Sequence, residues 1–246
     1  MAVTASPEIQ ARLLDVAACD LEIQRASTAL RGLSDTLHIP TLEAALDEIK
    51  GRLHDALVEK ETIQAELTRA ESDVQLVESR IAQDEERLVH TASAKDAQGL
   101  EHELESLKKR RSDLEDIELA IMERLEQADS ALSGLEAERD TAEGALAEAR
   151  TQFEATSAEL TAQRSAQEAA RGDIVSSLPE DLYALYERQR ERYGVGASHL
   201  RGGVSSASGV ALTESDLQEI RTAAPDQVIL CPDSNAILVR TSESGL

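Results

Sequence analysis

The fold of this chain is decided by residues 100–174, which read LEHELESLKKRRSDLEDIELAIMERLEQADSALSGLEAERDTAEGALAEARTQFEATSAELTAQRSAQEAARGDI. Steps of alternate threes and fours through this stretch meet an apolar residue at most positions, and no proline interrupts them. A 3.5-residue repeat of this length is typical of a helix that buries a narrow seam against another helix. The apolar members of the stripe include Leu100, Leu104, Leu107, Leu114, Ile121, Leu125, Leu132, Leu135, Leu146, Phe153, Leu160 and Ile174.

A second apolar stripe with the same spacing runs through residues 42–88, and the helix that carries it can pack against the first. Between the two stripes, the segment near residues 90–97 loses the period and collects small and polar residues, which is typical of a turn. The arms on either side of this turn are about equally long. A short turn between equal arms favours one antiparallel hairpin over a parallel dimer of single helices.

The first arm is expected to be interrupted. Ser6 offers an N-cap and Pro7 a first helical residue, so a helix should begin there. Pro40 cannot continue a preceding helix without a kink, so the arm should break near it. The sequence therefore predicts helices over about 7–36, 40–89 and 97–176, with the tip at about 90–97.

Polar residues break the long stripe at Arg111, Glu118 and Arg139, and we expect them to fix the register by pairing across the hairpin with partners such as Lys60 or Asp84. If the two helices pair about a centre near residue 93, Arg139 lies opposite Asp47. That position is defined to within about one helical turn.

Composition narrows the class of protein. Aromatic residues make up 2% of the chain and charged residues 30%, which favours long helices over a large globular core. The net charge of −23 repels nucleic acid over most of the surface, so nucleic acid is not the expected partner. The start of the chain lacks the features of a secretory signal, and no apolar stretch is long enough to span a membrane. We therefore expect a cytoplasmic protein.

The character of the sequence changes after residue 178. Residues 179–194 predict a short amphipathic helix with Tyr183 and Tyr186 on its apolar side. The glycine-rich segment 194–203 is interpreted as a connector, and a flexible linker is favoured there over a dinucleotide-binding loop. A short helix at 215–222 and β-prone runs at 228–230 and 236–239 then predict a small α+β head. A head of this size needs a metal, a disulfide or a docking surface for stability.

Four stretches in this order resemble the bacterial C4-type zinc-ribbon proteins that carry a long N-terminal coiled-coil hairpin, especially their actinobacterial members. They are LLDVAACDLEI near the start, LEHELESLKKRRSDLEDIELAIMERLE after the turn, LYERQR, and VILCPDSNAILVR at the end. The resemblance covers essentially the whole chain. It implies a mostly α fold, with a kinked antiparallel coiled-coil hairpin over residues 1–177 and a zinc-ribbon-like α+β head over residues 178–246.

The resemblance also implies a zinc site of four cysteines, CxxC followed by CPxCG, in the head. The matching positions here are Ser205, Ser208, Cys231 and Ser234. A neutral serine hydroxyl is a poor zinc donor beside a thiolate. We therefore expect a zinc-ribbon-like head that has lost its zinc, and no other cofactor.

The remaining candidates are surface residues. The one basic run, Lys108-Lys109-Arg110-Arg111, could bind an acidic partner or a phosphate backbone, although flanking acids favour pairing along the helix. Tyr183 and Tyr186 are a second candidate surface for a partner. The pattern contains no nucleophile elbow, P-loop or metal-binding HExxH, so no catalytic residue is predicted.

Three hypotheses on function remain from the sequence. The first is a non-enzymatic adaptor, scaffold or chaperone-like protein that binds other proteins through the tip and the head; some relatives implied by the resemblance act in this way for transcription and secretion components. The second is a nucleic-acid-binding regulatory protein of the zinc-ribbon type. The third is a structural homo-oligomer, with a homodimer as the simplest form.

Overall fold

The computed structural model describes residues 3–246, and they form two compact units. Unit 1 contains the residues up to Leu37 together with Thr151–Leu246, and unit 2 contains His38–Arg150. The predicted ranges 1–177 and 178–246 placed their boundary at the end of the hairpin, whereas the two units divide the chain within it. Residues 1 and 2 of the first predicted range lie outside the described residues.

The first arm of the hairpin consists of two helices, α1 (Pro7–Thr36) and α2 (Ile39–His90). Helix α1 begins as its sequence predicts, because the Ser6 hydroxyl accepts a hydrogen bond from the Ile9 amide at 3.4 Å. The break between the helices falls at His38, whose backbone is left-handed with φ 55°. Helix α2 thus starts one residue before the predicted Pro40, which occupies the first turn.

The second arm is one helix, α3 (Ala94–Val175). It starts three residues before the predicted position 97 because Ser93 caps it, with the Ser93 hydroxyl 3.4 Å from the Asp96 amide. Residues 91–93 therefore make a turn shorter than the predicted tip at 90–97.

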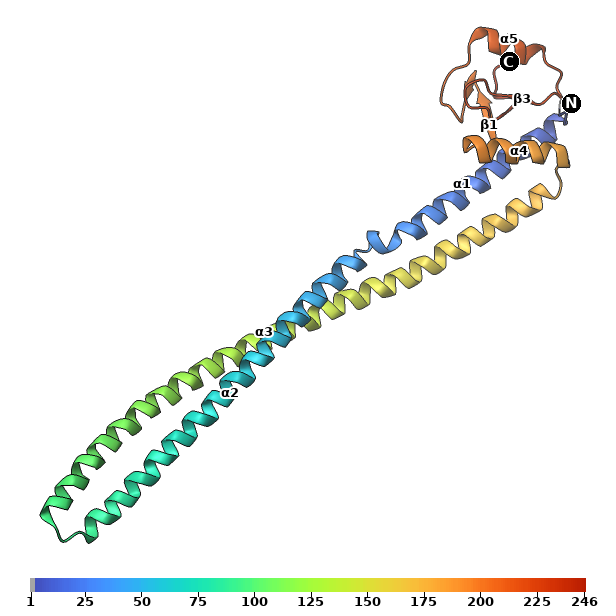
Figure 1. The fold of residues 1–246 in the computed structure, drawn as a ribbon. Helices are drawn as coiled ribbons and strands as arrows, with labels where there is room; N and C mark the ends of the chain where they lie inside the picture. Colours follow the sequence, from blue (N-terminus) through green and yellow to red (C-terminus); the bar gives the residue numbers. More distant parts are fainter. Residues whose placement is uncertain (1–2) are drawn as a thin grey trace. The chain divides into compact units, whose positions relative to one another are not determined.

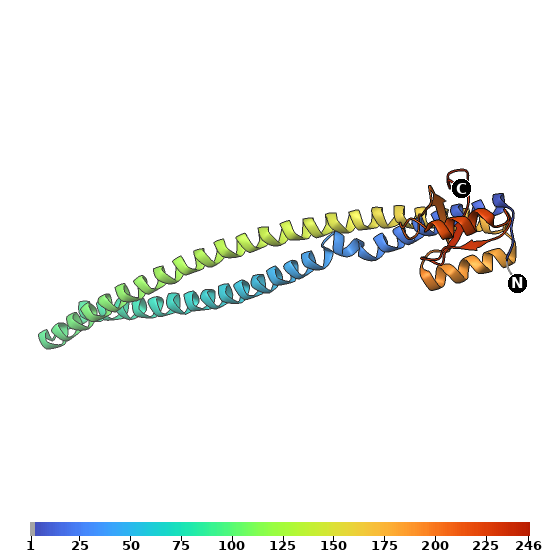
Figure 2. The same cartoon turned by 90° about the horizontal axis from the view of Figure 1, so that it is seen from above.

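In unit 2, α2 and α3 run antiparallel side by side (Figures 1 and 2). The seam includes the buried side chains Ile63, Leu67 and Ile121, as the two stripes predict. Ion pairs such as Arg52–Glu138 on one flank and Lys50–Glu143 on the other show that the register differs from the predicted one by about four to seven residues, which is one to two helical turns.

The polar positions of the stripe pair differently from the prediction. Arg139 hydrogen-bonds to the adjacent Asp140 at 2.6 Å, so the predicted pair with Asp47 was wrong. Arg111 pairs with Glu115 on its own helix. The buried Asp84 is bound by two arginines of α2, one on each side of it along the helix. Arg111 and Asp84 thus pair along their own helices, where residues three and four positions apart are neighbours.

The C-terminal part of unit 1 contains α4 (Glu180–Tyr193), α5 (Glu214–Thr222) and four short strands. The strands are β1 (Ala197–Arg201), β2 (Val204–Ser205), β3 (Ile229–Leu230) and β4 (Ile237–Val239). They form one sheet in the order β2-β1-β4-β3, in which β1 and β4 are parallel and the other neighbours are antiparallel. The mostly α fold with a small C-terminal α+β head is confirmed.

Strand β1 lies inside the segment that was predicted to be a glycine-rich connector, so that prediction was wrong. Its residues have modest strand propensity, and the strand forms because it pairs with both β2 and β4. Ala197 and Leu200 are buried in two different clusters on the two faces of the sheet. Long-range pairing therefore overrides the local signal of the flanking glycines.

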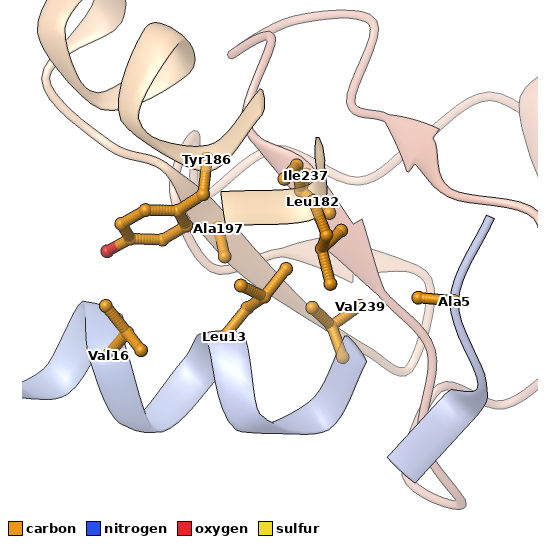
Figure 3. Packing of buried hydrophobic residues seen from close by; sticks show 8 residues of the cluster. All are labelled: Ala5, Leu13, Val16, Leu182, Tyr186, Ala197, Ile237 and Val239. Atoms are coloured by element: carbon orange, nitrogen blue, oxygen red, sulfur yellow. The ribbon is translucent and has the colours of Figure 1, made fainter. Parts of the chain in front are cut away.

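The main core of unit 1 joins this sheet to the first turns of α1 (Figure 3). Figures 1 and 2 show α4 and the sheet gathered around this end of α1. Alternate residues of β4 face opposite sides, so Ile237 and Val239 pack towards α1 and α4 while Leu238 packs towards α5. The core members in Figure 3 are Ala5, Leu13, Val16, Leu182, Tyr186, Ala197, Ile237 and Val239.

The helices in the described part of the chain do not include one that is both long and apolar enough to cross a membrane.

Candidate functional site

A network of charged side chains joins three helices of unit 1. Asp20 on α1 accepts a hydrogen bond from Arg171 Nε of α3 at 2.7 Å and another from the Tyr186 hydroxyl of α4 at 2.6 Å. Arg171 also hydrogen-bonds to Glu187 of α4, which Arg190 binds from the same helix. The side chains of Asp20 and Arg171 are only 17% and 18% exposed, so their charges attract more strongly than in open solvent.

The network fixes the protonation states of its members. Burial alone lowers the pKa of Arg171, but hydrogen bonds to Asp20 and Tyr183 outweigh it and raise this pKa above its ordinary value. Burial raises the pKa of Glu187, and hydrogen bonds and charges from Arg190 and Arg171 outweigh this and lower it. Burial, with the nearby Asp20, raises the pKa of Tyr186. These three groups therefore keep their usual charge near neutral pH, and the network holds α4 in place.

A groove of about 620 Å³ opens beside this network. One wall is an apolar row on α1 formed by Leu14, Ala17 and Leu21, and Leu21 is 47% exposed. Tyr186 and Asp20 also line it. A volume of this size is typical of sites that bind a ligand or the side chains of a partner.

The opposite wall of the groove is formed by the start of β1 and the turn after β2. It includes Gly196, His199 and Ser206. Gly196 lies so close to α4 that a Cβ atom there would stand 2.5 Å from the Tyr186 ring. The His199 ring is held by a 2.8 Å hydrogen bond between Nε2 and the Thr241 hydroxyl. The wall thus has few side chains that can move.

Two turns of the head share one backbone geometry. In the first, the Gly209 amide donates to the Ser205 carbonyl at 2.8 Å; in the second, the Asn235 amide donates to the Cys231 carbonyl at 2.9 Å. The fifth residue of each turn is left-handed, with φ 68° at Gly209 and φ 57° at Asn235. We call these segments, residues 205–209 and 231–235, the paired turns.

The side chains of the paired turns also correspond. The Ser208 hydroxyl accepts a hydrogen bond from the Val210 amide at 3.3 Å, and the Ser234 hydroxyl accepts one from the Ala236 amide at 3.4 Å. Each serine is therefore the fourth residue of its turn and bonds two residues ahead. The first and fourth residues of each turn therefore have the spacing of the two ligands in a CxxC pair.

The paired turns place two of the predicted ligand positions, Ser205 and Ser234, beside Cys231. Its thiol is completely buried and receives hydrogen bonds from the Ser205 and Ser234 hydroxyls and from the backbone amides of Asp233 and Ser234. Burial raises the pKa of this thiol, and the four hydrogen bonds outweigh burial and lower it. Ser205 is also 2.8 Å from the Ser198 hydroxyl.

These donors do not fit a tetrahedral zinc site. Zinc in structural sites takes four thiolate or imidazole ligands, and the paired turns offer one thiol and three hydroxyls. Within residues 3–246, no group of three or more histidine, cysteine or acidic side chains is placed to hold a metal ion. The other cysteine, Cys19, is a buried free thiol on α1.

Comparison with known proteins settles the family. The profile of the CT398-like coiled coil hairpin domain matches residues 16–194. The chain belongs to this family. It is 31% identical over 241 residues to the uncharacterized protein Rv2229c of Mycobacterium tuberculosis, a match that covers 94% of this chain and 95% of that protein.

Solved structures of similar proteins agree with this fold. A structure from Mycobacterium smegmatis is similar with a TM-score of 0.84 and 29% identity, covering 97% of this chain and 100% of that one. CT398 from Chlamydia trachomatis has a TM-score of 0.64 at 17% identity, with 95% and 99% coverage. The second likeness shows the shared fold alone.

The basic run of this CT398-like chain lies on α3 in unit 2. Lys108 pairs with Glu85 of α2 at 2.9 Å, and Arg111 pairs with Glu115. Lys109 and Arg110 are exposed and form no ion pair within the described residues. Two of the four cations of the basic run are thus paired with acidic side chains, and the other two, Lys109 and Arg110, face solvent.

The two tyrosines of the predicted partner surface lie in the network at the head. Tyr186 is completely buried, so it contributes to the floor of the groove rather than to an outer surface. Tyr183 is half-buried, and the Arg171 guanidinium lies 5.8 Å from the centre of its ring.

Sequence reasoning missed the charged network and the groove. Asp20 and Arg171 lie far apart in sequence, and no local pattern joins them. A usable signal was present nonetheless: Asp20 stands four residues after Val16 and next to Cys19, on the apolar side of α1, where a charge requires a partner.

Proposed function

We propose that this protein is a non-enzymatic cytoplasmic adaptor that binds a helical segment of a partner protein in the groove of unit 1, without zinc or another cofactor. The observation that carries the proposal is the groove itself. An apolar row on α1 stands half-exposed beside a floor that buried ion pairs hold in place. A preformed floor reduces the ordering cost of binding.

A helix is the partner element that suits this wall. Leu14, Ala17, Leu21 and Gln24 all line the groove and follow one another by three, four and three residues. That spacing is the one a second helix needs to pack along α1. The groove would then hold the partner's apolar side chains, with Arg190 and His199 at its polar edge.

A second surface for a partner protein, the basic run, supports the proposal that the protein is an adaptor. Lys109 and Arg110 are exposed on α3 and unpaired within residues 3–246, so an acidic segment of a protein can bind them without displacing an existing ion pair. Exposed cations of this kind contribute modestly to affinity and more to the rate of association.

The test is affinity purification of partners from the native cytoplasm with the full-length chain. We expect Leu21→Glu to lose partners that the wild type captures, because a charge would enter the apolar wall. Ala29→Glu is the matched control, since it adds the same charge to an exposed position of α1 that does not line the groove. Circular dichroism checks that both variants fold.

Other outcomes would contradict the proposal. Retention of every partner by Leu21→Glu would refute binding in the groove. Partners that disappear after nuclease treatment would favour a nucleic-acid-binding role, and gel-shift titration at low salt would confirm that role. A wild type that only captures copies of itself, with a matching mass by light scattering, would favour a structural homo-oligomer. Lys109→Glu/Arg110→Glu tests the second contact separately.

A further inference from the structure

One flank of the hairpin in unit 2 carries a ladder of ion pairs between α2 and α3. Glu43 pairs with Arg150 at 2.7 Å, Lys50 with Glu143 at 3.6 Å, and Glu85 with Lys108 at 2.9 Å. From one pair to the next, the residue number rises on α2 and falls on α3 by the same multiple of seven. The register is therefore constant along this flank. It places four further pairs of residue positions opposite one another: 57 and 136, 64 and 129, 71 and 122, and 78 and 115.

Four consecutive layers of this register, from 57/136 to 78/115, have no cation at their facing positions, and two of them, 71/122 and 78/115, form one surface. Glu78 lies opposite Glu115, and Glu71 lies opposite Met122. Glu115 is bound by Arg111 of its own helix, whereas Glu71 and Glu78 form no ion pair within the described residues. On the neighbouring layer, 64/129, Asp129 is bound by Lys60 at 2.7 Å. Like charges at facing flank positions of a coiled coil are unfavourable.

The same two layers expose large apolar side chains. Leu119 is 59% exposed and Met122 is 48% exposed. They lie three residues apart on α3, so they share one face of that helix. Leu119, Met122, Glu71 and Glu78 therefore form one surface, which we call the open flank. Contiguous exposed apolar side chains rimmed by polar residues mark interaction sites, and here the rim is uncompensated negative charge.

We infer that the open flank binds a basic amphipathic helix of a partner protein. The helix would cover Leu119 and Met122 with apolar side chains and place lysine or arginine against Glu71 and Glu78. A second copy of this chain fits poorly, because each copy carries a net charge of −23. Nucleic acid is repelled for the same reason. This surface lies in unit 2 and does not depend on the groove of unit 1.

The test uses full-length protein and a fluorescent synthetic helix of about 21 residues, in which leucine and lysine alternate with helical periodicity. Fluorescence anisotropy gives the dissociation constant for the wild type, Leu119→Ser/Met122→Ser and Glu71→Gln/Glu78→Gln. We expect each double variant to bind at least about tenfold more weakly, since each removes two contacts. Binding should also weaken as salt concentration rises.

Matched controls separate this surface from general attraction to an acidic protein. Leu76→Ser removes an exposed apolar residue of α2 that is not at a facing position of the ladder, and Glu154→Gln/Glu159→Gln removes two exposed charges from another part of α3. Both controls should bind the peptide like the wild type. All the substituted residues are exposed or half-exposed, and thermal unfolding checks that each variant folds.

Three results would overturn the inference. The first is equal affinity of wild type, double variants and controls for the peptide. The second is equally tight binding of a leucine–glutamate peptide of the same periodicity. The third is self-association of the wild type in light scattering that Leu119→Ser/Met122→Ser abolishes, which would assign the open flank to a second copy. Loss of binding by Leu21→Glu alone would concern the groove, so the two proposals fail separately.

Discussion

The paired turns make a sharp prediction about metal binding. We expect that the backbone of the paired turns suits a metal site and that only the thiol ligands are missing. The triple variant Ser205→Cys/Ser208→Cys/Ser234→Cys should then bind one zinc or cobalt ion per chain, with Cys231 as the fourth ligand. Each turn is already closed by its own backbone hydrogen bond, at 2.8 Å and 2.9 Å. Little of the binding energy is therefore needed to order the backbone.

The expected magnitude follows from mass action. Structural zinc sites bind with apparent free energies of about 10–16 kcal/mol at neutral pH. At a hundredfold excess of free zinc over the dissociation constant, the metal stabilises the folded state by about 2.7 kcal/mol. For a unit of this size that corresponds to a rise in the unfolding temperature on the order of 10 °C, which a chelator should reverse.

The assay is cobalt titration followed by absorption spectroscopy, with thermal unfolding in parallel. Tetrahedral thiolate coordination gives cobalt a characteristic visible spectrum, which should saturate at one equivalent. Ser205→Cys/Ser206→Cys/Ser234→Cys is the matched control, because it adds the same number of thiols with one of them at the wrong place in the turn. The wild type should hold zinc below stoichiometry.

Two results would refute this reasoning. If the control variant binds cobalt as tightly as the designed one, the spacing of the paired turns does not define a site. If the purified wild type holds one tightly bound zinc ion, the serine positions are not the metal ligands and another set of residues supplies them.

Three further predictions concern the stability of unit 1, measured by thermal or denaturant unfolding. Gly196→Ala should cost about 1–3 kcal/mol, because its Cβ meets a Tyr186 ring whose hydroxyl is held by Asp20; an unchanged stability would show that the ring can move. Arg240→Met should cost about 2–3 kcal/mol, since the Arg240 guanidinium donates to five backbone carbonyls around the end of α5, and Arg240→Lys should recover only part of the loss. The pKa of Glu187 in the folded protein is lowered from 4.5, so Glu187 stabilises the fold above pH 4.5, and this stabilisation is lost as the pH falls through the lowered pKa. Glu187→Gln should therefore reduce the loss of stability at acid pH. A variant that loses as much stability at acid pH as the wild type would contradict the assignment.

The long helices could be predicted from sequence because their signal is local and repeated. Each heptad of α2 and α3 adds an independent observation of the same stripe, so the arms and the turn emerge from periodicity alone. The register does not emerge in the same way. It depends on the length of the turn, and Ser93 shortens that turn by capping α3.

The site was harder to predict for a physical reason. The network depends on Asp20, Arg171 and Glu187, which come from three helices and meet only when α4 packs on the other two. Strand β1 is a related case, because it owes its conformation to two pairing partners rather than to its own residues. The positions Ser205, Ser208, Cys231 and Ser234 were matched through the resemblance to the zinc-ribbon proteins, and their role as a ligand frame stays a prediction.

The backbone of the paired turns has a consequence for how such a head can change over evolutionary time. Gly209 and Asn235 set the curvature of the turns, and main-chain hydrogen bonds close them, so the shape is independent of what the side chains bind. Cysteine and serine differ by one atom. We therefore expect that serine and cysteine can be exchanged one position at a time without rebuilding the turns, so that metal binding is separable from the fold of the head.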